Sequence, residues 1–146
     1  MDIIGFLNDV TGGELLLWKV IATTVLFGLA GLQVIMAARF WGVATVPGVS
    51  AKSAAAVHRT SGRIAVVLAV IVAVSCIAGP AGPTTPTRVM LHSVFGTLVF
   101  GVLIAKFLIL KVLKKGDKAL PFVGISLFLV FGAIWATTVA DYISAR

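Results

Sequence analysis

Both histidines of the chain stand four residues before a glycine, in the segments HRTSG and HSVFG. His58 is thereby matched with Gly62, and His92 with Gly96. On a helix, positions i and i+4 lie on one face, one turn apart. Each imidazole would therefore have a gap without a side chain beside it, which a flat macrocycle held by that imidazole would need. The alternative is that glycine is simply frequent, since 15 of the 146 residues are glycine and membrane helices tolerate it.

The segments that carry these histidines are typical of membrane spans. Hydrophobic residues make up 60% of the chain and charged residues 12%, which is too apolar for a soluble domain of this size. A transmembrane helix needs about 20 mostly apolar residues. Four segments meet this requirement: 15–41, 54–78, 87–112 and 120–143. The sequence predicts one all-α domain over residues 1–146, an integral membrane four-helix bundle with up-down-up-down topology. With no soluble domain, we expect no catalytic site of its own.

The first residues predict a short amphipathic helix that leads into the first span. Gly12 and Gly13 would end this helix, and a frayed terminus is the alternative. Asp2 and Asp9 argue against a secretory signal, which starts with positive charge.

The distribution of lysine and arginine predicts how the bundle is oriented. Two connections on one side of the membrane, with the helix ends beside them, carry Arg39, Lys52, Arg59, Arg63, Lys111, Lys114, Lys115 and Lys118. The acidic residues other than Asp117 fall on the opposite side. The positive-inside rule then places both termini outside and the basic loops in the cytoplasm. The net charge of +7 is explained by this topology and by attraction to anionic lipid heads, so no nucleic acid is expected as a partner.

This topology separates the two histidines, because spans two and three run antiparallel. His58 would lie near the cytoplasmic surface and His92 near the outer one, roughly 20 to 30 Å apart by the helix rise. They therefore cannot be the two axial ligands of one haem within a chain. Other chemistries lack their residues: the sequence has no paired carboxylates in a span, no Cys/His cluster at metal spacing and no phosphate-binding loop.

HRTSGRIA at the start of one span, with TRVMLHSVFGTLVFGVLIAKFLIL opening the next, resembles a small bacterial family of four-helix membrane proteins. That family is similar to the transmembrane b-type cytochromes that include the ascorbate-linked and ferric-reductase cytochromes. The resemblance covers about the last two thirds of the chain and implies haem b. Relatives carry a further histidine directly before a cysteine near the outer end of span two. Here Ser75 stands before Cys76, so the partner of His92 across the iron is missing.

Haem at His92 is the first expectation, and a second site at His58 stays open. Met36 lies near the depth of His58, and histidine with methionine is an established axial pair. A thiolate ligand at Cys76 is less expected, because a buried apolar thiol tends to stay protonated. The remaining candidates have two roles. Gly96 beside His92 and Gly62 beside His58 would leave space for the macrocycle. Arg88 near His92, and Arg59 and Arg63 near His58, could pair with haem propionates. Each arginine has an alternative role in topology and headgroup contact.

Two hypotheses about function follow. In the first, the chain is a membrane electron-transfer subunit of a redox complex in the bacterial inner membrane, binding haem and taking electrons from a quinol or a cytoplasmic donor. In the second, it is a haem-free subunit that anchors a respiratory or photosynthetic membrane complex, with its histidines as hydrogen-bonding groups between helices. The resemblance favours the first, whereas the missing histidine favours the second. Both predict the lipid bilayer and other membrane subunits as partners.

Overall fold

The computed structural model describes residues 3–79, 85–113 and 119–144, and these ranges contain helices and turns without a strand. In order, the elements are α1 (Ile3–Thr11), α2 (Leu15–Phe40), α3 (Ala51–Ala78), α4 (Pro86–Leu108), a π-helical segment η1 (Ile109–Leu113) and α5 (Leu120–Ser144). The predicted all-α class is confirmed.

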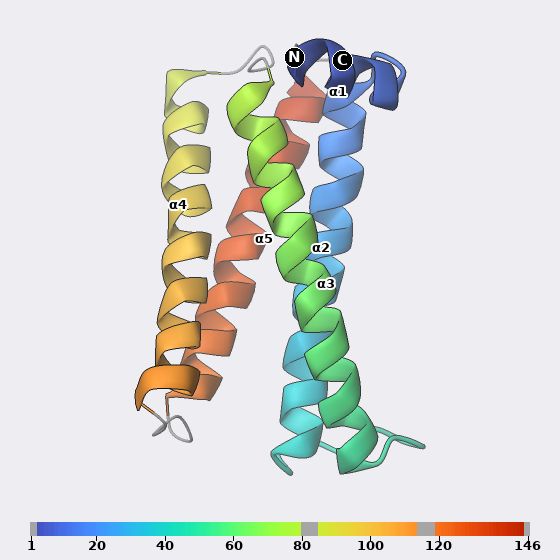
Figure 1. Cartoon of the computed structure of the whole chain (residues 1–146), viewed down its shortest axis with the longest axis vertical. Helices are drawn as coiled ribbons and strands as arrows, with labels where there is room; N and C mark the ends of the chain where they lie inside the picture. Colours follow the sequence, from blue (N-terminus) through green and yellow to red (C-terminus); the bar gives the residue numbers. More distant parts are fainter. Residues whose placement is uncertain (1–2, 80–84, 114–118, 145–146) are drawn as a thin grey trace.

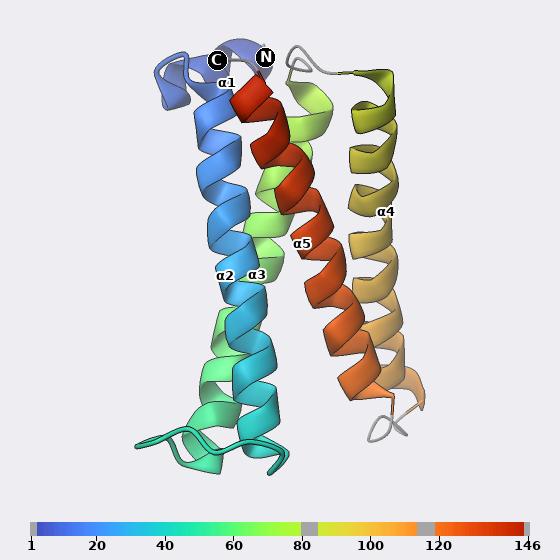
Figure 2. The same cartoon turned by 180° about the vertical axis from the view of Figure 1, so that it is seen from behind.

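The four long helices form an up-down-up-down bundle, as predicted (Figures 1 and 2). We call the end that holds α1 and the last turn of α5 the terminal end. The opposite loop end holds residues 41–50 and the first turn of α5. All four helices are long and apolar enough to cross a membrane. The largest shift from the predicted bounds is at the end of α4, which ends at Leu108 rather than at residue 112 and is continued by η1. Helix α3 begins at Ala51 rather than at residue 54.

Local sequence explains where the helices begin. Gly12 and Gly13 have φ angles of 60° and 84°, a left-handed region that favours glycine, and they separate the predicted lead-in helix α1 from α2. The hydroxyl of Ser50 accepts a hydrogen bond from the backbone N–H of Ser53 at the start of α3. Thr85 caps α4 in the same way, with proline at the first helical position.

The bundle is packed unevenly. Helix α2 packs along α3 and α5, and α5 packs along α4, whereas α3 and α4 make few backbone contacts with each other. The buried apolar cluster is accordingly built mainly from α2 and α3. Helix α2 contributes Ala22, Leu26 and Ala30, α3 contributes Ala69 and Val72, and α4 and α5 contribute one residue each, Val99 and Phe131. The α3–α4 side of the bundle is therefore its least closed side.

Helices α2 and α5 are joined by an aromatic stack. The ring of Phe27 lies between Phe128 and Trp135, with centroid separations of 5.1 and 5.3 Å. The indole N–H of Trp135 donates to the hydroxyl of Thr24 at 2.9 Å. Gly132 makes room for the stack, because a Cβ atom there would lie 3.2 Å from Cε2 of Phe27. This contact fixes the register of α5 on α2.

We expect Gly132→Val to destabilise the protein by about 1–3 kcal/mol, the usual cost of adding methyl groups to a packed contact. Gly124→Val is the matched control on the same helix, since nothing lies within 4 Å of a Cβ at that position. The control should stay within about 0.5 kcal/mol of the wild type. Unfolding in mixed micelles measures both variants. Equal losses of stability in Gly132→Val and Gly124→Val would contradict a rigid stack.

Candidate functional site

His92 lies in the second turn of α4, at the terminal end, and is half-buried. Its Nδ1 is 3.1 Å from the hydroxyl oxygen of Thr137 on α5. That hydroxyl donates its only hydrogen to the carbonyl of Ile134 at 2.8 Å, so it accepts from the imidazole. Nδ1 therefore carries the hydrogen, and Nε2 keeps a free lone pair. No sequence pattern indicated Thr137 as the partner of His92, because the two residues lie 45 positions apart in the chain.

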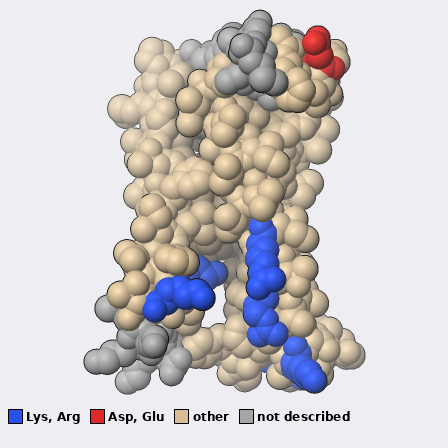
Figure 3. Space-filling view, viewed as in Figure 1, with Lys and Arg blue, Asp and Glu red and all other residues tan. Residues whose placement is uncertain are grey.

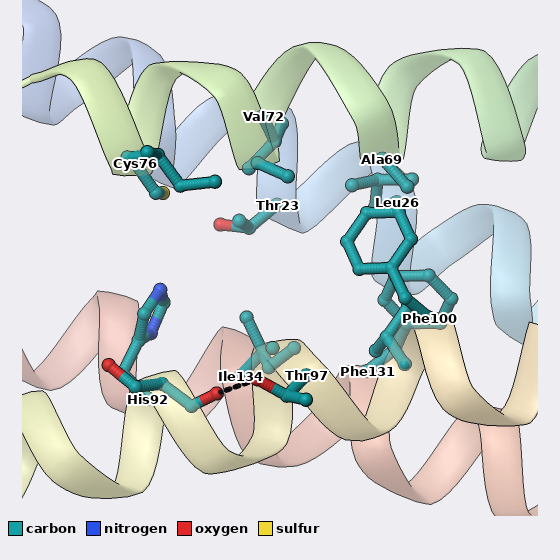
Figure 4. Close-up of a pocket in the computed structure, with 15 residues that line it drawn as sticks. Thr23, Leu26, Ala69, Val72, Cys76, His92, Thr97, Phe100, Phe131 and Ile134 are labelled. Carbon is teal, nitrogen blue, oxygen red and sulfur yellow. Dashed lines mark hydrogen bonds between the residues drawn. The ribbon is translucent and has the colours of Figure 1, made fainter.

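The imidazole of His92 opens onto a cavity of about 310 Å³. Figure 4 shows the ring pointing from α4 into the space below α3, towards Cys76. Most of the lining is apolar, with Leu26, Val72, Phe100, Phe131 and Ile134 among its residues. Gly96 also lines the cavity, and nothing lies within 4 Å of a Cβ placed there. The gap predicted one turn beyond His92 is therefore present.

The opposite wall of the cavity holds Cys76 but not Ser75. Cys76 lines the cavity. Ser75 is only 1% exposed, and its hydroxyl donates to the carbonyl of Ile71 at 2.8 Å within α3. Cys76 and His92 therefore line the same cavity from facing helices. In this helix orientation the side chain before the cysteine does not face the cavity, so position 75 does not present a ligand to His92.

Arg88 stands one turn before His92, as expected, and reaches α5. One of its Nη atoms lies 3.6 Å from a carboxylate oxygen of Asp141 and donates to the hydroxyl of Ser144 at 2.8 Å. Asp141 and Lys19 both act electrostatically on His92. The terminal end of the site is therefore a polar rim above an apolar cavity.

His58 has a different environment, at the loop end. Its Nδ1 donates to the carbonyl of Gln33 at 3.0 Å, and the Gln33 amide donates to the carbonyl of His58 at 2.8 Å and to the hydroxyl of Ser61. A Cβ at Gly62 would lie 3.1 Å from Oε1 of Gln33. The gap predicted beside His58 is thus filled by a side chain from α2. Gln33 was not among the candidates predicted from the sequence, although a polar residue inside an apolar span is a signal for a contact of this kind.

The other candidates near His58 are dispersed. Met36 is buried on α2, one turn beyond Gln33, whereas Arg59 and Arg63 are exposed on α3. The structure brings Gly96, Arg88 and His92 together at the terminal end, and it places His58 with Gly62 near the other end of the bundle. Within the described ranges, no three His, Cys, Asp or Glu side chains are grouped so as to hold a metal ion.

The four apolar helices define a multi-pass membrane protein. The chain belongs to the family of unknown function DUF6529, which it matches over residues 6–145. Comparison with curated proteins and with solved structures gives no match.

Proposed function

We propose that this protein is a membrane electron-transfer subunit of b-type cytochrome character, with haem held by His92. One observation carries the proposal: Nε2 of His92 presents a free lone pair to an apolar cavity, with open space at Gly96 one turn further along. An imidazole oriented through its other nitrogen is the usual arrangement of a metal-binding histidine. The resemblance of the two H-x-x-x-G segments to b-type cytochromes supports the same function.

The residues around the cavity fit a haem in kind. Phe100 and the aliphatic side chains supply an apolar wall, and Arg88 lies at the polar rim where propionates would end. The volume of about 310 Å³ is at the lower limit of cofactor pockets, which range over roughly 300–1,000 Å³. The sparse contact between α3 and α4 gives the direction in which the pocket can widen.

The described lining of the cavity includes one histidine, which separates this site from a bis-histidine one. Across the cavity α3 presents the thiol of Cys76. When bound, haem supplies one-electron chemistry. The chain's own residues would then have three roles: His92 would hold the iron, Thr137 would keep the imidazole hydrogen at Nδ1, and the apolar lining would exclude water. A second haem at His58 has less support, because Gln33 fills the space beside Gly62.

The partners follow from the four apolar helices, which make up most of the described residues. We infer that electrons come from a quinol or a cytoplasmic donor and pass to another membrane subunit at the outer face. The basic residues of the loop end favour a cytoplasmic location for that end by the positive-inside rule, in the bacterial inner membrane that the resemblance implies.

A second candidate function is a haem-free anchoring subunit of a larger membrane complex. The exposure of α4 favours it: Val99 is the one residue of that helix that is fully buried. Small side chains at Ser93, Thr97, Gly101 and Ala105 recur every fourth residue on exposed positions, a spacing that lets a neighbouring helix approach closely.

The absorption spectrum of the purified protein tests the first function against the second. After reduction with dithionite, a haem-binding chain should show the sharp visible band of a b-type cytochrome. The preparation should be supplied with haem during expression, so that supply does not limit occupancy. A colourless, folded preparation would leave the anchoring function.

A further inference from the structure

The loop end of the bundle concentrates positive charge. Its described cations are Arg39, Lys52, Arg59, Arg63, Lys106 and Lys111, whereas every described acidic residue lies at the terminal end: Asp9, Glu14 and Asp141. Asp117 falls outside the described residues. In Figure 3, Lys and Arg side chains line both walls of a hollow in the lower half of the molecule, over α3 on one side and the end of α4 on the other.

Lys106 is the least expected of these cations. It lies inside the apolar stretch of α4, six residues before Val112, or roughly 9 Å along the helix axis. It is half-buried on α4, and its ammonium lies within electrostatic range of His58 on α3. A charge at this depth in a bilayer is costly unless it is paired.

Exposed apolar side chains share helix faces with these cations. Val66 and Val70 lie three and seven residues after Arg63 on α3, and Leu110 lies four residues after Lys106. All three side chains are 43–49% exposed. The same face therefore combines a cationic centre with flanking surface for hydrocarbon chains. A phospholipid with a net negative charge has this combination of groups, whereas a soluble anion would have to leave water to reach Lys106.

We propose that the opening between α3 and α4 at the loop end binds one anionic phospholipid, whose phosphodiester group lies between Lys106 and the Arg59 and Arg63 side chains of α3. Lysine and arginine both donate hydrogen bonds to phosphate oxygens. The acyl chains lie along the exposed apolar side chains. This site is separate from the His92 cavity, so it holds whether or not the protein binds haem.

The test is lipid binding by the full-length protein after delipidation in a neutral detergent. Native mass spectrometry and thermal unfolding should be recorded with phosphatidylglycerol, with phosphatidylcholine of the same acyl chains, and with inorganic phosphate. We expect phosphatidylglycerol alone to bind as a single retained lipid and to raise the melting temperature. Lys106→Gln should weaken its binding about tenfold or more, since it removes the half-buried charge.

Two variants distinguish a defined lipid-binding site from nonspecific electrostatic attraction between lipid headgroups and the basic loop end. Lys106→Arg keeps the charge and should retain most of the binding. Lys52→Gln removes an exposed charge from the first turn of α3 and should change binding only about twofold, because exposed charges are screened. Equal losses in Lys52→Gln and Lys106→Gln would overturn the proposal. An equal response to phosphatidylcholine, or saturation by inorganic phosphate, would also overturn it.

Discussion

Replacing His92 by alanine is expected to remove the b-type absorption band completely while leaving the bundle folded. In the proposed function the imidazole would supply the bond to iron, and no other described side chain at this end of the cavity is a histidine. Its one hydrogen bond, to Thr137, joins half-buried groups near the rim. A hydrogen bond between membrane helices is worth only about 0.6 kcal/mol on average, so the fold should survive. Absorption spectra and circular dichroism measure the two outcomes.

Two further variants show whether the effect belongs to this histidine. His58→Ala should keep the band, because that imidazole is hydrogen-bonded to Gln33 at the other end of the bundle. Thr137→Val leaves the ligand in place but removes its orienting partner, and it should lower haem affinity about 10–100-fold. A band that survives in His92→Ala and disappears in His58→Ala would move the site to the loop end.

The sequence predicted most of the fold because the bilayer imposes it. Apolar length gave the four spans, and two glycines with positive φ gave the break after α1. The separation of the histidines followed from antiparallel spans alone. The side of the membrane on which the termini lie stays a prediction. The π-helical segment after Leu108 was not predicted, since a pattern of apolar residues does not distinguish an α-helical turn from a wider one.

The site was predicted in part, and the difference lies in long-range contacts. HxxxG occurs twice, yet only Gly96 borders open space, because Gln33 of α2 fills the space at Gly62. Which gap is filled depends on a neighbouring helix, and spacing along one helix carries no information about it. The hydrogen bond from His92 to Thr137 likewise joins two helices, α4 and α5. The HxxxG pattern therefore identifies both histidines as candidate ligands, and only the packing of neighbouring helices distinguishes them.

The departure at Ser75 has a structural counterpart. The sequence led us to expect that a site with two histidines would have the partner of His92 at this position. In this chain the position is fully buried within α3 and away from the cavity, whereas the next residue, Cys76, lines it. A histidine placed at 75 would therefore need a rotation of α3 about its axis to reach the cavity. The site of this chain is built around one imidazole, with a thiol on the facing helix.

The second-largest loss of haem is expected when a large side chain at position 96 fills the cavity. Gly96→Phe places an aromatic ring where nothing now lies within 4 Å, so the helix should tolerate the change while the space beside His92 is lost. We expect haem content to fall about tenfold or more, equivalent to the 1–3 kcal/mol cost of overpacking. Gly101→Phe is the matched control: it lies on the same helix, has equally open space, and is outside the cavity lining. If both variants lost haem equally, the loss would reflect a general disturbance of α4 rather than the filling of the cavity. If Gly96→Phe kept its haem, the macrocycle would not occupy this cavity.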